Sequence, residues 1–122
     1  APAGAAGMTR ARAAGRPVPL EAVRTIASGL GAPYAGERTF PIVRALVEEI
    51  VVLTDAEIVE GTRFLAARAR LLVEPAGAAS VGALLAGRIR VGAGERVGAV
   101  LSGGNLDLSR AAELLGAAQA GG

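Results

Sequence analysis

The chain has 122 residues, of which 52% are hydrophobic and 18 are glycine, so it can form one modest domain with its own core. All 13 basic residues are arginine, and the net charge of +2 with few aromatic side chains argues against nucleic-acid binding. The lack of cysteine and histidine excludes disulfides, thiolate metal sites and histidine bases. With no membrane-spanning apolar run and no signal peptide visible, we expect a cytoplasmic protein without a membrane partner.

The first third of the chain predicts one helix between loops. Residues 1–7 are small and are typical of a loop that leaves a strand. Residues 8–14 predict a short helix, and Gly15 supplies its C-terminal stop. Residues 17–19 contain two prolines, which favour an extended link. Residues 27–31 predict a glycine-rich loop.

The middle of the chain predicts helix, strand and helix. Pro41 is expected at the first position of a helix over residues 40–47. Residues 49–53 form a β-branched run that predicts a buried strand. Residues 54–57 (TDAE) have the pattern of a capping box. The helix that follows should pack one face on the core, with Phe64 serving that core, through Ile58, Thr62, Leu65 and Ala69.

The last part predicts two more helices and one strand. Pro75 opens a thin helix of mostly alanine and glycine that Gly87 ends. Residues 92–95 predict a turn, residues 96–101 a strand, and residues 108–118 a final helix before a frayed tail at residues 121–122. Together these elements predict an α/β fold in which helices flank a mostly parallel sheet.

The tetrapeptide Ser102-Gly103-Gly104-Asn105 ends the second predicted strand. Its two glycines allow a sharp turn and a close approach to a bound group. Ser102 and Asn105 place a hydroxyl and an amide at this turn. Ligands of open α/β sheets bind beyond the carboxyl ends of strands, so a ligand is expected here. Taken alone, the tetrapeptide favours a plain turn, because Gly-Gly turns are common.

Three stretches together resemble one family of enzymes. They are residues 25–30 (TIASGL) with 36–43 (GERTFPIV), residues 73–79 (VEPAGAA), and residues 102–105 (SGGN). In this order and spacing, from about Met8 to Leu108, the chain resembles the pyridoxal-phosphate dependent threonine dehydratase and serine racemase family, whose fold is tryptophan synthase beta-like (fold type II). The resemblance implies the cofactor pyridoxal 5'-phosphate, which such enzymes hold as a Schiff base on a lysine.

The absence of lysine decides what this chain can contribute. With no lysine and no glycine-rich phosphate loop, residues 1–122 are expected to be the C-terminal portion of a single catalytic domain. The resemblance implies that the missing N-terminal part is its partner and that the complete protein is a homo-oligomer. We expect no catalytic residue in this chain and no activity from the chain alone.

The resemblance implies a set of cofactor-binding residues: Ser102, Gly103, Gly104, Asn105, Gly29 and Glu74. Ser102 would meet the pyridine nitrogen of the cofactor. Glu74 also fits a simpler role, because a carboxylate at a helix N-terminus stabilises the helix dipole. Ser28 stands where the family usually has aspartate, which puts one substrate contact in doubt.

A metal site is not expected. Some relatives bind a divalent cation where this chain has Ala1, Ala5 and Gly7, and only the Ala5 carbonyl could still serve. The family also has long members that append a regulatory domain, and we expect a short, unregulated form.

A neutral hydroxyl at the ring nitrogen does not force its protonation as a carboxylate would. The resemblance therefore implies elimination from serine or threonine, giving a 2-oxo acid and ammonia, with a small amino acid as substrate. Racemisation by a serine or threonine racemase of the same family stays open. So do a non-catalytic remnant or interaction domain, which the absent lysine and Ser28 favour, and another lyase such as a threonine synthase.

Overall fold

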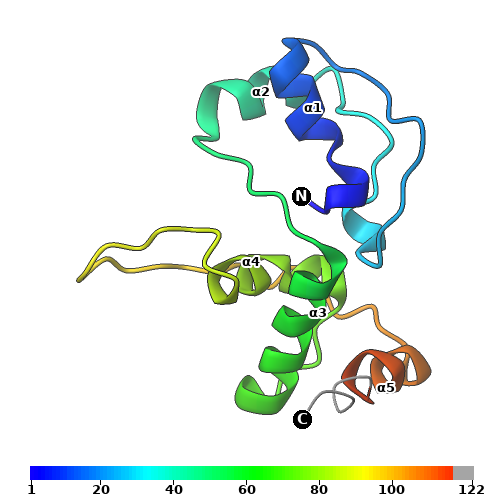
Figure 1. Cartoon of the computed structure of the whole chain (residues 1–122), viewed down its shortest axis with the longest axis vertical. Coiled ribbons are helices and arrows are strands. Elements are labelled where there is room, and N and C mark those ends of the chain that lie inside the picture. The colour runs from blue at the N-terminus through cyan, green and yellow to red at the C-terminus, as the bar shows by residue number, and fades with distance from the viewer. Residues whose placement is uncertain (117–122) are drawn as a thin grey trace. The chain divides into compact units, whose positions relative to one another are not determined.

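The computed structural model describes residues 1–116, and the chain divides into two compact units. Unit 1 is Ala1–Asp55, and unit 2 begins at Ala56. Each unit is built from helices joined by irregular segments (Figure 1). Within the described residues, no helix is long and apolar enough to cross a membrane.

Unit 1 is organised around two short helices that pack together, α1 (Gly7–Ala14) and α2 (Thr39–Leu46) (Figure 1). Single 3-10 turns lie at Ala3–Ala5 (η1) and Ser28–Leu30 (η2). The predicted first helix is confirmed, and Gly15 ends it with φ 71° and an N–H bonded to the Arg12 carbonyl. The second is confirmed too, except that it begins before Pro41.

The predicted strand over residues 49–53 is wrong for this chain. The described residues contain no strand, only an isolated parallel bridge between Pro2 and Leu53. Ala3 N–H donates to the Leu53 carbonyl at 2.7 Å, and Leu53 N–H donates to the Ala1 carbonyl at 2.8 Å. A strand must pair with a neighbouring strand along its length, and in this segment only Leu53 has such a partner among the described residues. The bridge is parallel, as the predicted sheet requires, but the α/β expectation is met only in its helices.

Unit 2 contains α4 (Pro75–Leu85), α5 (Leu108–Gly116) and all of α3 (Asp55–Phe64) except its first residue, and a π turn over Leu65–Ala69 follows α3. The predicted apolar face of α3 is confirmed at three positions, because Ile58, Thr62 and Leu65 are buried. It is wrong at Ala69, which the wider π turn rotates to the surface.

The prediction that Phe64 serves the core is also wrong. Its side chain is 42% exposed. Phe64 lies two residues after the buried Thr62, which is about 200° around the helix, so the face that buries Thr62 points Phe64 outward.

Glycines bring α3 and α4 into direct backbone contact where the two helices cross (Figure 1). A Cβ on Gly61 would lie 2.6 Å from the Ala78 carbonyl oxygen and 2.7 Å from the Gly82 nitrogen. A Cβ on Gly82 would lie 2.6 Å from the Glu57 carbonyl oxygen. The thin helix predicted from the sequence is therefore confirmed, and its thinness serves contact with a neighbouring helix.

The chain after α4 leaves as a long loop and returns to the helix (Figure 1). Gly87, with φ 64°, follows the C-cap of α4, and the turn predicted over residues 92–95 is confirmed by Gly94 at φ 82° and by Glu95 N–H bonded to the Gly92 carbonyl at 3.2 Å. Residues 96–101 are not a strand, because no strand lies beside them in the described part of the chain. The last helix is confirmed to Gly116; its predicted end and the frayed tail lie outside the described residues.

Candidate functional site

The segment 100–105, which carries the predicted turn, lies against α4. The Ser80 hydroxyl of α4 donates to the Val100 carbonyl at 3.0 Å. The backbone N–H of Glu74, the residue before α4, donates to the Gly103 carbonyl at 3.1 Å. Between these two points, a Cβ on Gly77 would lie 2.8 Å from the Gly103 nitrogen. The segment therefore runs along the first two turns of α4 towards the helix N-terminus.

Glu74 is the N-cap residue of α4 and has extended backbone angles, φ −64° and ψ 156°, with Pro75 at the first helical position. Its side chain makes no capping hydrogen bond to the helix. The carboxylate instead lies beside Gly103, in the space that a Cβ on that glycine would need. The Glu74 carboxylate therefore contacts the turn at Gly103, a contact that a role as helix cap does not require.

The turn does not use the left-handed backbone freedom of glycine, because neither Gly103 nor Gly104 has a positive φ. The tight geometry is instead a short bond from the Leu106 N–H to the Gly104 carbonyl, at 2.8 Å. A Cβ on Gly103 would meet the end of the Glu74 side chain, which can move, whereas a Cβ on Gly77 of α4 would meet the Gly103 backbone nitrogen and oxygen at 2.8 and 2.9 Å.

Ser102 and Asn105 are the polar side chains of this turn, and both are exposed. Neither side chain hydrogen-bonds to any residue that the structure describes. A hydroxyl and a carboxamide are thus presented to solvent on a backbone that is held at two points. This arrangement suits recognition of a polar atom on a ligand.

Gly29 lies in unit 1, within the exposed η2 turn. Asp55 holds the approach to this turn, because its carboxylate accepts from the Thr25 hydroxyl at 2.7 Å and from the Ile26 N–H at 3.1 Å. The structure thus brings Glu74 and Gly103 together, and it places Gly29 in the other unit.

Two residues that order these loops were missed in the sequence. Asp55 was assigned to a capping box, and nothing local reveals a partner thirty residues earlier. Ser80 did carry a signal, since it is the single hydroxyl in a helix of alanine, glycine and aliphatic residues. Within residues 1–116, no three His, Cys, Asp or Glu side chains gather as metal ligands would.

The comparison with protein families settles the family. Residues 1–103 match the model described as "Pyridoxal-phosphate dependent enzyme". The chain belongs to this family. The predicted relationship to threonine dehydratases and serine racemases is confirmed by curated relatives.

An L-threo-3-hydroxyaspartate ammonia-lyase of Pseudomonas sp is 40% identical over 100 residues, which are 80% of this chain and 30% of that protein. The serine racemase of Arabidopsis thaliana is 38% identical over 111 residues, which are 88% of this chain and 33% of that protein. The chain therefore spans about a third of the length of the curated relatives it matches.

Solved structures agree with the curated relatives. A threonine deaminase from T.th. matches with a TM-score of 0.73 at 38% identity, over 87% of this chain and 38% of that one. Maize serine racemase matches with a TM-score of 0.81 at 34% identity, over 88% of this chain and 34% of that one. The chain is thus a part of a pyridoxal-phosphate dependent domain of fold type II.

The Ser102 turn carries a group that suits the pyridine nitrogen of pyridoxal phosphate, but the chain has no residue that could bind this cofactor covalently. The unpartnered Ser102 hydroxyl is a neutral donor or acceptor, which suits a pyridine nitrogen. The close packing of Gly77, Gly103 and Glu74 gives that hydroxyl a fixed support. No lysine is present in the sequence, so this chain has no side-chain amine to bind the cofactor covalently.

Proposed function

We propose that this chain forms the ring-nitrogen end of the cofactor site in a threonine or serine ammonia-lyase, an enzyme that converts its substrate into a 2-oxo acid and ammonia. The observation that carries the proposal is the Ser102 hydroxyl, which is exposed and makes no hydrogen bond within residues 1–116, on a turn fixed to α4 by Ser80 and Glu74. The ammonia-lyases and threonine deaminase among the relatives support it. The remaining part of the domain would supply the lysine and the phosphate loop.

The cofactor, when bound, withdraws electrons from the α-carbon of an amino acid joined to it. The part of this chain is to orient and tune the ring. We propose that the Ser102 hydroxyl donates to the ring nitrogen while Gly103 and Gly104 leave room for the ring's edge. A hydroxyl carries no charge, so it does not stabilise a protonated ring nitrogen as a carboxylate would.

The remaining predicted residues have supporting parts in this proposal. The Asn105 carboxamide is exposed on the same turn and can hydrogen-bond to the cofactor or to water beside it. The Glu74 N–H holds the Gly103 carbonyl, and the Glu74 carboxylate lies beside Gly103. Gly29 lies on the η2 loop, which would face the substrate, a small amino acid such as serine or threonine. We propose a cytoplasmic homo-oligomer for the complete protein.

A serine or threonine racemase is the second candidate, and the serine racemases among the relatives favour it. Racemases and ammonia-lyases act on the same α-carbon, so the same Ser102 turn serves both. A non-catalytic remnant is the third candidate, favoured by the absence of lysine and by Ser28 in place of aspartate.

The test is a chimera in which this chain replaces the matching segment of the T.th. threonine deaminase. We expect the chimera to bind pyridoxal phosphate and to form 2-oxo acid from L-threonine. Ser102→Ala should weaken cofactor affinity about fivefold, the effect of one lost hydrogen bond of ordinary net strength. Ser102→Asp should lower the elimination rate more than the affinity. Ser109→Ala, in the exposed first turn of α5, is the control.

Each outcome of the chimera experiment decides between the candidates. Equal affinity and rate in wild type, Ser102→Ala and Ser102→Asp would show that the turn is only structural. Formation of D-serine from L-serine without 2-oxo acid would favour the racemase. A chimera that folds but neither binds the cofactor nor turns over substrate would favour the remnant. The 122-residue chain alone should form no 2-oxo acid.

A further inference from the structure

Ser80 uses its side chain in an unusual way for a helical serine. It is the single residue of α4 whose side chain can form a hydrogen bond, since the other residues of Pro75–Leu85 are proline, alanine, glycine, valine and leucine. Its hydroxyl donates to the Val100 carbonyl at 3.0 Å, twenty residues further along the chain. A helical serine hydroxyl often bonds instead to the carbonyl four residues before it.

The hydroxyl contributes nothing that the helix itself needs. Serine favours helix less than alanine does, and α4 is otherwise rich in alanine. The contact with Val100 is therefore the physical role that the structure gives to this hydroxyl.

Residues 96–101 depend on that contact. Among the residues that the structure describes, no other hydrogen bond reaches this segment. Packing holds it weakly, because the side chains of Val97 and Val100 are 52% and 76% exposed. The next hydrogen bond along the chain is the one from the Glu74 N–H to the Gly103 carbonyl.

We propose that Ser80 is a positioning residue that holds the Ser102 turn on α4. Ser102 lies between the two held carbonyls of Val100 and Gly103, so both bonds are needed to fix the direction in which its hydroxyl points. Loss of the Ser80 bond leaves the turn attached only on its C-terminal side. That the turn matters for a cofactor rests on the proposed function. That Ser80 holds the turn on α4 does not.

The test uses the 122-residue chain without cofactor. In Ser80→Ala, backbone NMR relaxation should show residues 99–102 passing from ordered values, an order parameter of about 0.85, to flexible ones of about 0.6 or below. Residues 75–85 should keep their values, because alanine favours helix at least as well as serine. Ser80→Thr, which keeps the hydroxyl, should restore the order of residues 99–102. Ser109→Ala serves as the matched control and should change neither segment.

Two further results separate this proposal from its alternatives. The melting temperature should change by less than about 2 °C in Ser80→Ala, because one exposed hydrogen bond contributes little to global stability. If residues 99–102 stay as ordered in Ser80→Ala as in the wild type, or if Ser80→Thr fails to restore them, the proposal is overturned. Because no cofactor is present, these results do not depend on whether the Ser102 turn binds one.

Discussion

The two units of the chain solve the same packing problem in different ways. Unit 1 fills its small core with one aromatic ring, because Phe40 of α2 packs with Ala11 of α1 and with Ala35. Unit 2 brings α3 and α4 together through Gly61 and Gly82, with no side chain between the two backbones at that point. The aromatic residue of unit 2 is Phe64, and it is 42% exposed, so no ring fills that core.

The difference teaches which substitutions each unit can absorb. In unit 1 the stability comes from the volume and apolar area of a ring, so removing atoms is costly. Unit 2 also buries Leu65, Val73 and Ala78, but at the crossing of α3 and α4 its backbones are in contact, so adding atoms at that point is costly. Opposite kinds of substitution should therefore damage these two sites.

The largest effect is expected from Phe40→Ala in unit 1. The ring is 6% exposed, and its removal should lower the free energy of unfolding by about 3 kcal/mol. Denaturant unfolding followed by circular dichroism measures this change. Ile42→Ala in the same helix is the control, because Ile42 is 58% exposed. Equal losses in the two variants would show that the ring is not the core of unit 1.

Gly61→Ala should have the next largest effect, in unit 2. The added Cβ would lie within 2.7 Å of two backbone atoms of α4, so the helices must separate, at a cost of about 2 kcal/mol. Gly116→Ala in α5 is the matched control, since nothing lies within 4 Å of its added Cβ. That control should leave stability unchanged or raise it, and a loss as large as that of Gly61→Ala would contradict the contact model.

Asp55→Ala should have a smaller effect, confined to loop order in unit 1. It removes the acceptor of the bonds from the Thr25 hydroxyl and the Ile26 N–H, at a cost of about 1.5 kcal/mol. Amide hydrogen exchange at residues 26–31 should quicken. Exposed Glu49→Ala removes one carboxylate without such bonds and should leave those amides unchanged. Unchanged exchange in Asp55→Ala would show that the loop is held by other contacts.

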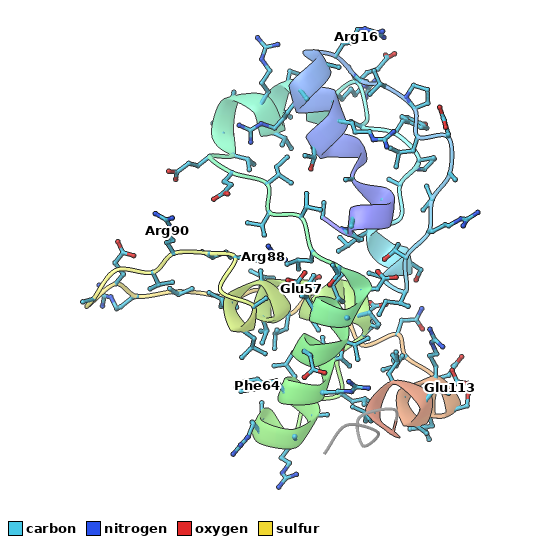
Figure 2. The ribbon with its side chains drawn as sticks, in the orientation of Figure 1. Arg16, Glu57, Phe64, Arg88, Arg90 and Glu113 are labelled. Carbon is cyan, nitrogen blue, oxygen red and sulfur yellow. The ribbon has the colours of Figure 1, made fainter. Side chains whose placement is uncertain are left out.

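The smallest effect is expected from Arg88→Ala. Arg88 pairs with Glu57 at 2.7 Å and links the loop after α4 to α3 (Figure 2), but half of its side chain is exposed, so about 0.5 kcal/mol is at stake. Raising the salt concentration to about 1 M should remove most of the difference from the wild type. Arg90→Ala, in the same exposed loop, is the control (Figure 2). A loss above about 2 kcal/mol would mean that the pair is more than a surface ion pair.

The helices could be predicted because their signals are local. Gly15 stops α1, Pro75 starts α4, and the spacing of Ile58, Thr62 and Leu65 marks the buried face of α3. The strands could not, because a strand forms only beside another strand. Residues 49–53 and 96–101 have strand composition, yet in the described residues their one strand-like pairing is between Leu53 and Pro2.

The sequence predicted which residues form the candidate site, but it did not predict how they contact one another. The Ser102–Asn105 motif indicated where a ligand would bind, and the family it resembles is confirmed. The contacts that Gly103 makes with Glu74 and Gly77 could not be predicted, because these partners lie almost thirty residues earlier in the chain. The roles toward a cofactor stay predictions for all six residues, Ser102, Gly103, Gly104, Asn105, Gly29 and Glu74.

The π turn over Leu65–Ala69 bears on insertions and deletions in the gene. It ends in Arg70, whose φ of 59° breaks the helix, and it holds one residue more than an α-helical turn would. Loss of the codon for Ala67 would let this turn relax to α-helical form, downstream of the buried face that ends at Leu65. The same three-base deletion between Ile58 and Gly61 would rotate every later residue by about 100° and turn Gly61 away from α4. The end of α3 can therefore change in length where its middle cannot.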